Sequence, residues 1–67
     1  MKFIKTLEGF YLNVAAIETL NVQSTTQGDI IIVANTNHPG RYVLAICGSK
    51  ENAQLWLREF FDRYKEI

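Results

Sequence analysis

The chain contains one cysteine and one histidine, the two residue types here that could act together as a nucleophile and its base. Cys47 ends an apolar segment that begins at Arg41, and His38 lies in the polar loop before that segment. If residues 41–47 form a strand, a rise of about 3.3 Å per residue places the two side chains roughly 20 Å apart, far beyond hydrogen-bond reach. We therefore predict that Cys47 is a small buried hydrophobe, that His38 is a turn residue, and that no residue is catalytic.

Other chemistry finds equally little support. A metal site needs three or four ligands, and one cysteine with one histidine falls short unless carboxylates or a second subunit contribute. The four glycines are scattered singly, so no glycine-rich loop could cradle a phosphate. Glu59, Asp62 and Glu66 stand beside cations on a face that we expect to be exposed, where burial cannot tune them for acid–base work. We predict no metal, no cofactor and no enzymatic activity.

The strongest periodic pattern in the chain runs over residues 49–67. Apolar residues recur there at spacings of three and four, which places them on one side of a helix. This stripe comprises Ala53, Leu57, Phe60, Tyr64 and Ile67, and Trp56 and Phe61 flank it. Ser49 stands where an N-cap belongs, and Glu51 places negative charge in the first turn. We predict an amphipathic helix whose aromatic residues lie in the core, with Leu55 left as an exposed contact residue.

Two short apolar segments precede this helix at the start of the chain. Residues 2–7 and 10–12 are joined by Glu8 and Gly9, and Gly in the second turn position supplies the positive φ that a hairpin demands. Asn13 follows, and the next three residues are too short for an independent helix. We expect a β-hairpin and then a turn or a single helical turn.

Three longer strands are expected at residues 17–23, 30–34 and 41–47. The first alternates, with Leu20 and Val22 on one side, which predicts one buried and one polar face. The other two are apolar on both parities, as in strands that are covered on both faces. Polar loops connect the three strands, and in the second loop we expect Pro39 and Gly40 to form a turn in which Gly40 has a positive φ.

The order of strands first and one helix last predicts an α+β fold. We expect a single domain over residues 1–67, with an antiparallel sheet or small open barrel of four to five strands followed by one C-terminal amphipathic helix. A domain of 67 residues buries only about 60% of the surface that its unfolded chain exposes, so its core is small.

Composition and charge narrow the partner classes. Seven Lys and Arg balance seven Asp and Glu, which argues against nucleic-acid binding driven by charge. A single cysteine cannot form an internal disulfide, so a cytoplasmic location is predicted. Lys2 and Lys5 precede apolar residues as in a signal peptide, but Glu8, Gly9 and Asn13 interrupt the apolar run that such a peptide needs. The sequence contains no run of about 18 apolar residues, so no membrane-spanning helix is predicted.

Residues 10–18 contain the pattern F-x-L-N-x-x-x-I-E, and Arg41-Tyr42-Val43 and then Ser49-Lys50-Glu51 follow it. In these segments the chain resembles the small bacterial FlbD/SwrD flagellar proteins. Its loops at 23–29 and 35–40 are longer than the turns of that family and differ from them. The resemblance implies a small cytoplasmic accessory or interaction protein with no catalytic residues.

These observations together favour a non-enzymatic bacterial module that binds another, unidentified protein. The alternative is a single-stranded nucleic-acid-binding domain that uses its sheet face, with Trp56, Phe60, Phe61 and Tyr64 as the aromatic candidates for stacking on bases. Their helical spacing favours the core instead.

We also expect the domain to form a homodimer. One helix covers only one face of a sheet, whereas residues 30–34 are apolar on both faces, and in the last strand Tyr42, Leu44 and Ile46 would point opposite to Val43, Ala45 and Cys47. The uncovered face could be closed by the first hairpin, which would make a small barrel, or by a second copy that pairs either its faces or its edge strands.

Overall fold

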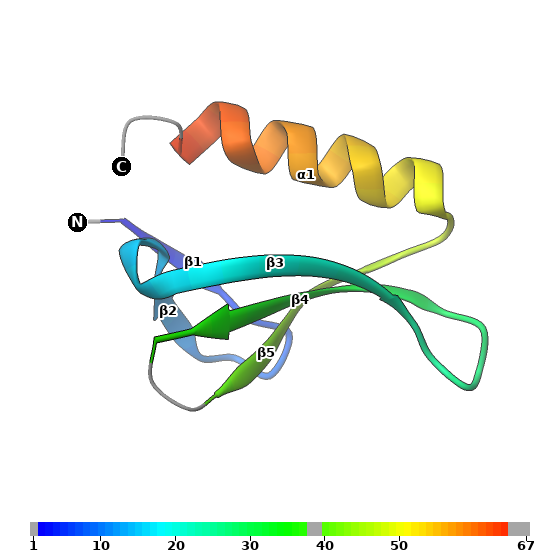
Figure 1. The fold of residues 1–67 in the computed structure, drawn as a ribbon, viewed down its shortest axis with the longest axis horizontal. Helices are drawn as coiled ribbons and strands as arrows, with labels where there is room; N and C mark the ends of the chain where they lie inside the picture. The colour runs from blue at the N-terminus through cyan, green and yellow to red at the C-terminus, as the bar shows by residue number, and fades with distance from the viewer. Residues whose placement is uncertain (1, 38–39, 65–67) are drawn as a thin grey trace.

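The computed structural model of the chain describes residues 2–37 and 40–64. Within these residues the elements follow one another as β1 (Phe3–Lys5), β2 (Tyr11–Asn13), the 3-10 turn η1 (Val14–Ala16), β3 (Ile17–Ser24), β4 (Ile30–Thr36), β5 (Arg41–Cys47) and α1 (Lys50–Tyr64). A two-stranded and a three-stranded antiparallel sheet precede the helix, and both sheets are open (Figure 1). The predicted α+β class is therefore confirmed, and closure into a barrel is not observed.

The predicted first hairpin forms, with Ile4 opposite Leu12 in an antiparallel ladder, but its strands are shorter than predicted. The ladder ends at Lys5 opposite Tyr11, so residues 6–10 connect the strands instead of Glu8 and Gly9 alone. Its turn contains Gly9 at φ 94°, a conformation that favours glycine. The buried Thr6 holds the turn together, because its hydroxyl accepts a hydrogen bond from the Phe10 N–H at 3.1 Å and its carbonyl accepts one from the Gly9 N–H at 3.0 Å. This polar side chain is buried without leaving an unsatisfied group.

A single helical turn follows at η1, also as predicted. The Asn13 side-chain oxygen caps it by accepting a hydrogen bond from the Ala15 N–H at 3.0 Å. The Val14 N–H donates to the Lys2 carbonyl at 3.0 Å, which ties the turn back to the start of the hairpin. The cap thus fixes the point at which the chain leaves the first sheet for the second.

The second sheet has the order β3-β4-β5, so β4 is its central strand. β4 extends two residues past the predicted end, because Asn35 and Thr36 pair with Thr19 and Ile17. In β5 the register shifts: Ile32 stands opposite Ala45 but Val33 stands opposite Val43. The bulge leaves Leu44 without an opposing residue and turns its side chain into the core beside Ala45.

Because of this bulge, the predicted faces of the last strand are wrong for Leu44. Leu44 is buried with Ala45 and Cys47 on the helix side instead of pointing away with Ile46. Ile46 is 61% exposed on the opposite face. A sequence reading that assumes strict alternation cannot locate a bulge, because one extra residue reverses every orientation beyond it.

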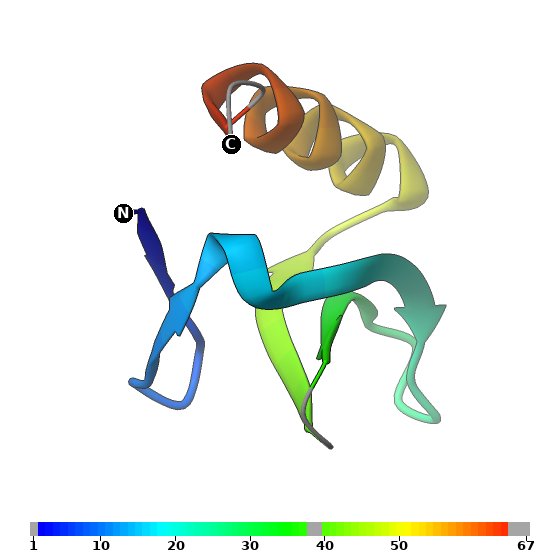
Figure 2. The ribbon, with the colours of Figure 1, turned by 60° about the vertical axis from the view of Figure 1, so that its left-hand side comes forward.

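The core lies between the sheet and α1. Ile32, Ala34, Leu44 and Ala53 form the buried cluster, and Ile4 and Leu12 of the first hairpin pack against it. The hairpin therefore lies at the side of the same core that the helix covers, as Figure 2 shows. Ser49 is the predicted N-cap, since its hydroxyl accepts a hydrogen bond from the Asn52 N–H at 3.1 Å.

Among the described residues no further layer covers the opposite sheet face, and the alternative in which the first hairpin closes over it is not observed. The hairpin attaches to the edge of β5 instead, where the Leu7 N–H donates to the Val43 carbonyl at 3.0 Å. Ile31 and Val33 on this face are nevertheless buried. Polar side chains of the same sheet account for the cover: Arg41 donates to Gln23, and Asn35 donates to Thr19. Long polar side chains thus shield the apolar centre of the face.

Candidate interaction surface

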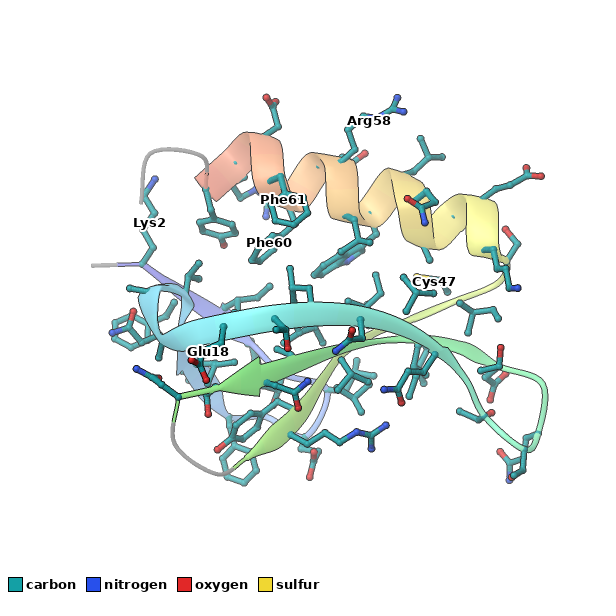
Figure 3. All side chains as sticks on the ribbon, viewed as in Figure 1. Lys2, Glu18, Cys47, Arg58, Phe60 and Phe61 are labelled. Atoms are coloured by element: carbon teal, nitrogen blue, oxygen red, sulfur yellow. The ribbon has the colours of Figure 1, made fainter. Side chains whose placement is uncertain are left out.

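Within the described residues, the side chains that the sequence offers for catalysis or metal binding are not assembled into a site. Within the described ranges, no group of three His, Cys, Asp or Glu could hold a metal ion. Cys47 is partly buried and packs against the core at the end of β5, between sheet and helix (Figure 3). This position agrees with the predicted role of a small hydrophobe. His38 lies outside the described residues, as does Glu66, while Glu59 and Asp62 are exposed on the helix.

The aromatic residues of α1 mostly contact one another. Phe60 is buried, with its ring stacked on Trp56 at a centroid distance of 5.4 Å and tilted against Tyr64 at 4.8 Å. The Lys2 ammonium lies 5.8 Å from the centre of the Tyr64 ring. The predicted core role therefore holds for these three rings, which are engaged within the molecule and are not free to stack on nucleobases.

Phe61 is the exception to the predicted aromatic core. Its side chain is 57% exposed, and its ring makes an edge-to-face contact with Phe60 at 5.7 Å (Figure 3). One helical residue advances the side chain by about 100°, so Phe61 cannot share the inward direction of Phe60. Leu55, predicted to be exposed, is also more than half exposed.

Most of the exposed large hydrophobic side chains lie on the first hairpin. Of the seven large hydrophobic side chains that are at least half exposed in the described part of the chain, four come from this hairpin: Phe3, Leu7, Phe10 and Tyr11. The other three, Ile46, Leu55 and Phe61, are single residues of β5 and α1. We call the four hairpin residues together with Lys5 the hairpin surface.

Strand alternation explains why three residues of the hairpin surface, Phe3, Lys5 and Tyr11, face outward. Ile4 and Leu12 stand opposite each other and pack against the core, so their neighbours Phe3, Lys5 and Tyr11 point the other way. Lys5 lies directly opposite Tyr11, and Phe3 is the diagonal neighbour of Tyr11, within reach of a large side chain. Tyr11 is 71% exposed, more than any other large hydrophobic residue of the hairpin. One outward face thus presents two aromatic rings beside one cation.

The inner side of the hairpin tip adds a shallow pocket of about 280 Å³, lined by Phe10, Tyr11, Leu12 and Tyr42. Tyr42 reaches this pocket from β5 by lying across Gly40. A Cβ atom at Gly40 would come within 2.9 Å of the Tyr42 ring. Gly40 does not have the positive φ that its turn position predicted; among the described residues only Gly9 and Gly28 do. Its small size serves the close approach of the tyrosine ring.

Sequence reasoning did not single out the hairpin surface. The alternation of Phe3, Ile4 and Lys5 shows that the short strand has two faces, but three residues do not show which face is buried. The deciding contact is that of Ile4 and Leu12 with the buried cluster, whose residues in β4, β5 and α1 lie far along the chain. A high density of large apolar residues at positions 3–12 was the only local signal.

No protein family, curated protein or solved structure matches this chain. Among the described residues, no helix has the length and apolar character needed to cross a membrane.

Proposed function

We propose that the protein is a non-enzymatic interaction module that binds another protein through the hairpin surface. The observation that carries this proposal is the concentration of Phe3, Leu7, Phe10 and Tyr11, each at least half exposed, within nine consecutive residues. Apolar side chains that gather in this way on a small domain mark a binding surface, whereas single exposed ones need no explanation.

The chemistry of the hairpin surface describes its partner. Exposed aromatic side chains supply the buried centre of a protein interface, and a polar rim surrounds that centre. Lys5 is the cation of this rim, so the partner should offer an apolar patch with a carboxylate that faces Lys5. We place the interaction in the cytoplasm, because the single thiol of Cys47 is unpaired. An accessory role in bacteria is what the resemblance to the FlbD/SwrD proteins implies.

Site-specific photocrosslinking tests this proposal. A photoreactive phenylalanine analogue at position 11 should give a discrete crosslinked product in a lysate of the source organism. The same analogue at position 54, an exposed site on α1, should not. Excess unmodified protein should suppress the product, whereas the Phe3→Ser/Leu7→Ser double variant should not, because its apolar contacts are removed.

Each of those two serine substitutions is at a residue at least half exposed and should cost about 1 kcal/mol of folding stability or less, so the double variant stays folded. Equal crosslinking at positions 11 and 54, or equal competition by the double variant, would contradict the proposal.

A second candidate function is single-stranded nucleic-acid binding, and the outward face of the hairpin favours it. Phe3 and Tyr11 flank Lys5 there, which is the combination of rings and cation that stacks on bases and contacts phosphate. The net charge of zero weighs against it. Fluorescence anisotropy with mixed-sequence oligonucleotides at low salt decides between the two functions. A Kd below about 1 μM that rises steeply with salt and is lost in Tyr11→Ser would favour nucleic acid.

A further inference from the structure

β3 is the longest strand of the described chain and forms an outer edge of its sheet. Seven of its eight residues pair with β4 on one side, and no described element pairs with the other side (Figure 1). An unpaired edge is a template for another strand, and proteins usually protect it with Pro or Lys residues. Residues Ile17–Ser24 contain neither, and Glu18 is their only charge. The bulge between Ile17 and Thr19 disturbs only the start of this edge.

The alternation of bonded and non-bonded pairs between β3 and β4 shows which backbone groups of β3 face outward. The Thr25 N–H donates to the Asp29 carbonyl at 2.8 Å, and these residues continue the register in which Ser24 stands opposite Ile30. Bonded and non-bonded pairs alternate along an antiparallel ladder. Gln23, Asn21 and Thr19 therefore bond to β4, and the N–H and C=O groups of Leu20, Val22 and Ser24 point away from it.

We propose that this edge pairs with β3 of a second copy, which forms a twofold homodimer with one continuous six-stranded sheet. With the axis at Asn21, the outward-facing groups of Leu20 meet those of Val22 in the second copy, and both side chains lie on the helix side of the sheet. The same register places Glu18 opposite Ser24. The two Glu18 carboxylates then lie roughly 20 Å apart, since six residues separate them along the edge, so like charges do not meet.

An apolar groove continues this edge on the helix side. Ile17, Leu20 and the exposed Phe61 contribute to its lining, and it has a volume of about 250 Å³. A second copy paired at the edge brings its own Val22 against Leu20, at the mouth of this groove. The dimer thus adds an apolar side chain of the second copy to one end of this groove, and it adds buried area to the strand pairing itself.

The structure favours edge pairing over face-to-face packing. Val33 and Ile31 on the face away from the helix are already buried by side chains of their own sheet, so that face leaves only Ile46 for a second copy to cover. The far edge of the sheet is partly covered, because the Leu7 N–H of the first hairpin donates to the Val43 carbonyl of β5. β3 is the edge of the three-stranded sheet to which no described element is paired.

Sedimentation equilibrium from about 1 to about 100 μM tests the dimer and should show twice the monomer mass at the upper end. Val22→Pro removes an N–H that faces the second copy and leaves every bond to β4 in place. An edge strand tolerates proline at such a position. Val22→Ala is the matched control, since it removes side-chain volume but keeps the N–H. Two hydrogen bonds are lost per dimer, so Val22→Pro should raise the dissociation constant at least about tenfold above that of Val22→Ala.

Disulfide trapping tests the register. In a Cys47→Ser background, Asn21→Cys places two thiols across the axis in a non-bonded pair, with Cα atoms about 4.5 Å apart, which is within disulfide range. Mild oxidation should then link the dimer. Gln23→Cys is the control and should not link, because its two copies lie about four residues apart along the edge.

Three results would overturn the proposal: a strict monomer at about 100 μM, equal dissociation constants for the two Val22 variants, or equal crosslinking at positions 21 and 23. Tyr11→Ser should leave the dimer unchanged, because Tyr11 lies beside β5 and not beside β3. Failure of the dimer and failure of the hairpin surface are therefore separate outcomes.

Discussion

Phe60→Ala is expected to lower the free energy of unfolding by about 3–5 kcal/mol. The Phe60 side chain is 8% exposed and joins the stacked Trp56 ring to the tilted Tyr64 ring. Its removal leaves a cavity between helix and sheet and separates these two partners. A domain of 67 residues is typically stable by only about 3–10 kcal/mol, so the variant should lose about a third or more of its stability.

Phe61→Ala is the matched control, because it removes the same side chain from the next position of the same helix. Phe61 is 57% exposed, and its loss should cost about 1 kcal/mol or less. Urea unfolding followed by circular dichroism gives both values, at a protein concentration low enough to keep wild type monomeric. Equal losses for the two variants would show that α1 packs through a different face.

The sequence predicts α1 well because its signals are local. Apolar residues at spacings of three and four identify the buried face, and Ser49 marks the start of the helix. The hydroxyl of Ser49 accepts a hydrogen bond from the Asn52 N–H, which confirms the predicted cap. The alternation of Leu20 and Val22 and the positive φ expected at Gly9 are equally local signals, and both are confirmed. The length of the connection around Gly9 is not, since residues 6–10 form it. The predicted aromatic core fails only at Phe61, which the period places at the border of the stripe.

The remaining features depend on contacts between distant residues. Strict alternation misplaced Leu44, since the bulge opposite Ile32 and Val33 arises from pairing between two strands and not from either strand alone. The hairpin surface was not predicted because the buried side of β1 is decided by the core that α1 and β4 complete. The sequence leaves the second sheet face to a hairpin or a second copy; within the chain the hairpin does not cover it, and the paired side chains of Arg41 and Gln23 lie on it.

Ile32→Ala should have an effect as large as that of Phe60→Ala, about 3–5 kcal/mol of unfolding free energy. Ile32 is 0% exposed at the centre of the middle strand, where Val22 and Ala45 flank it and Ala53 of the helix belongs to the same buried cluster. The cost of such a truncation depends on how far the surroundings can collapse into the cavity. Here hydrogen-bonded strands on both sides hold the backbone apart, so little collapse is expected.

Ile46→Ala is the control for this substitution, with the same side chain removed from the neighbouring strand. Ile46 is 61% exposed on the face away from the helix, and its truncation should cost about 1 kcal/mol or less. Urea titrations of both variants at one low protein concentration provide the comparison. If Ile46→Ala destabilises the monomer as much as Ile32→Ala does, the face away from the helix contributes a second core. The conclusion that polar side chains alone shield Ile31 and Val33 would then be wrong.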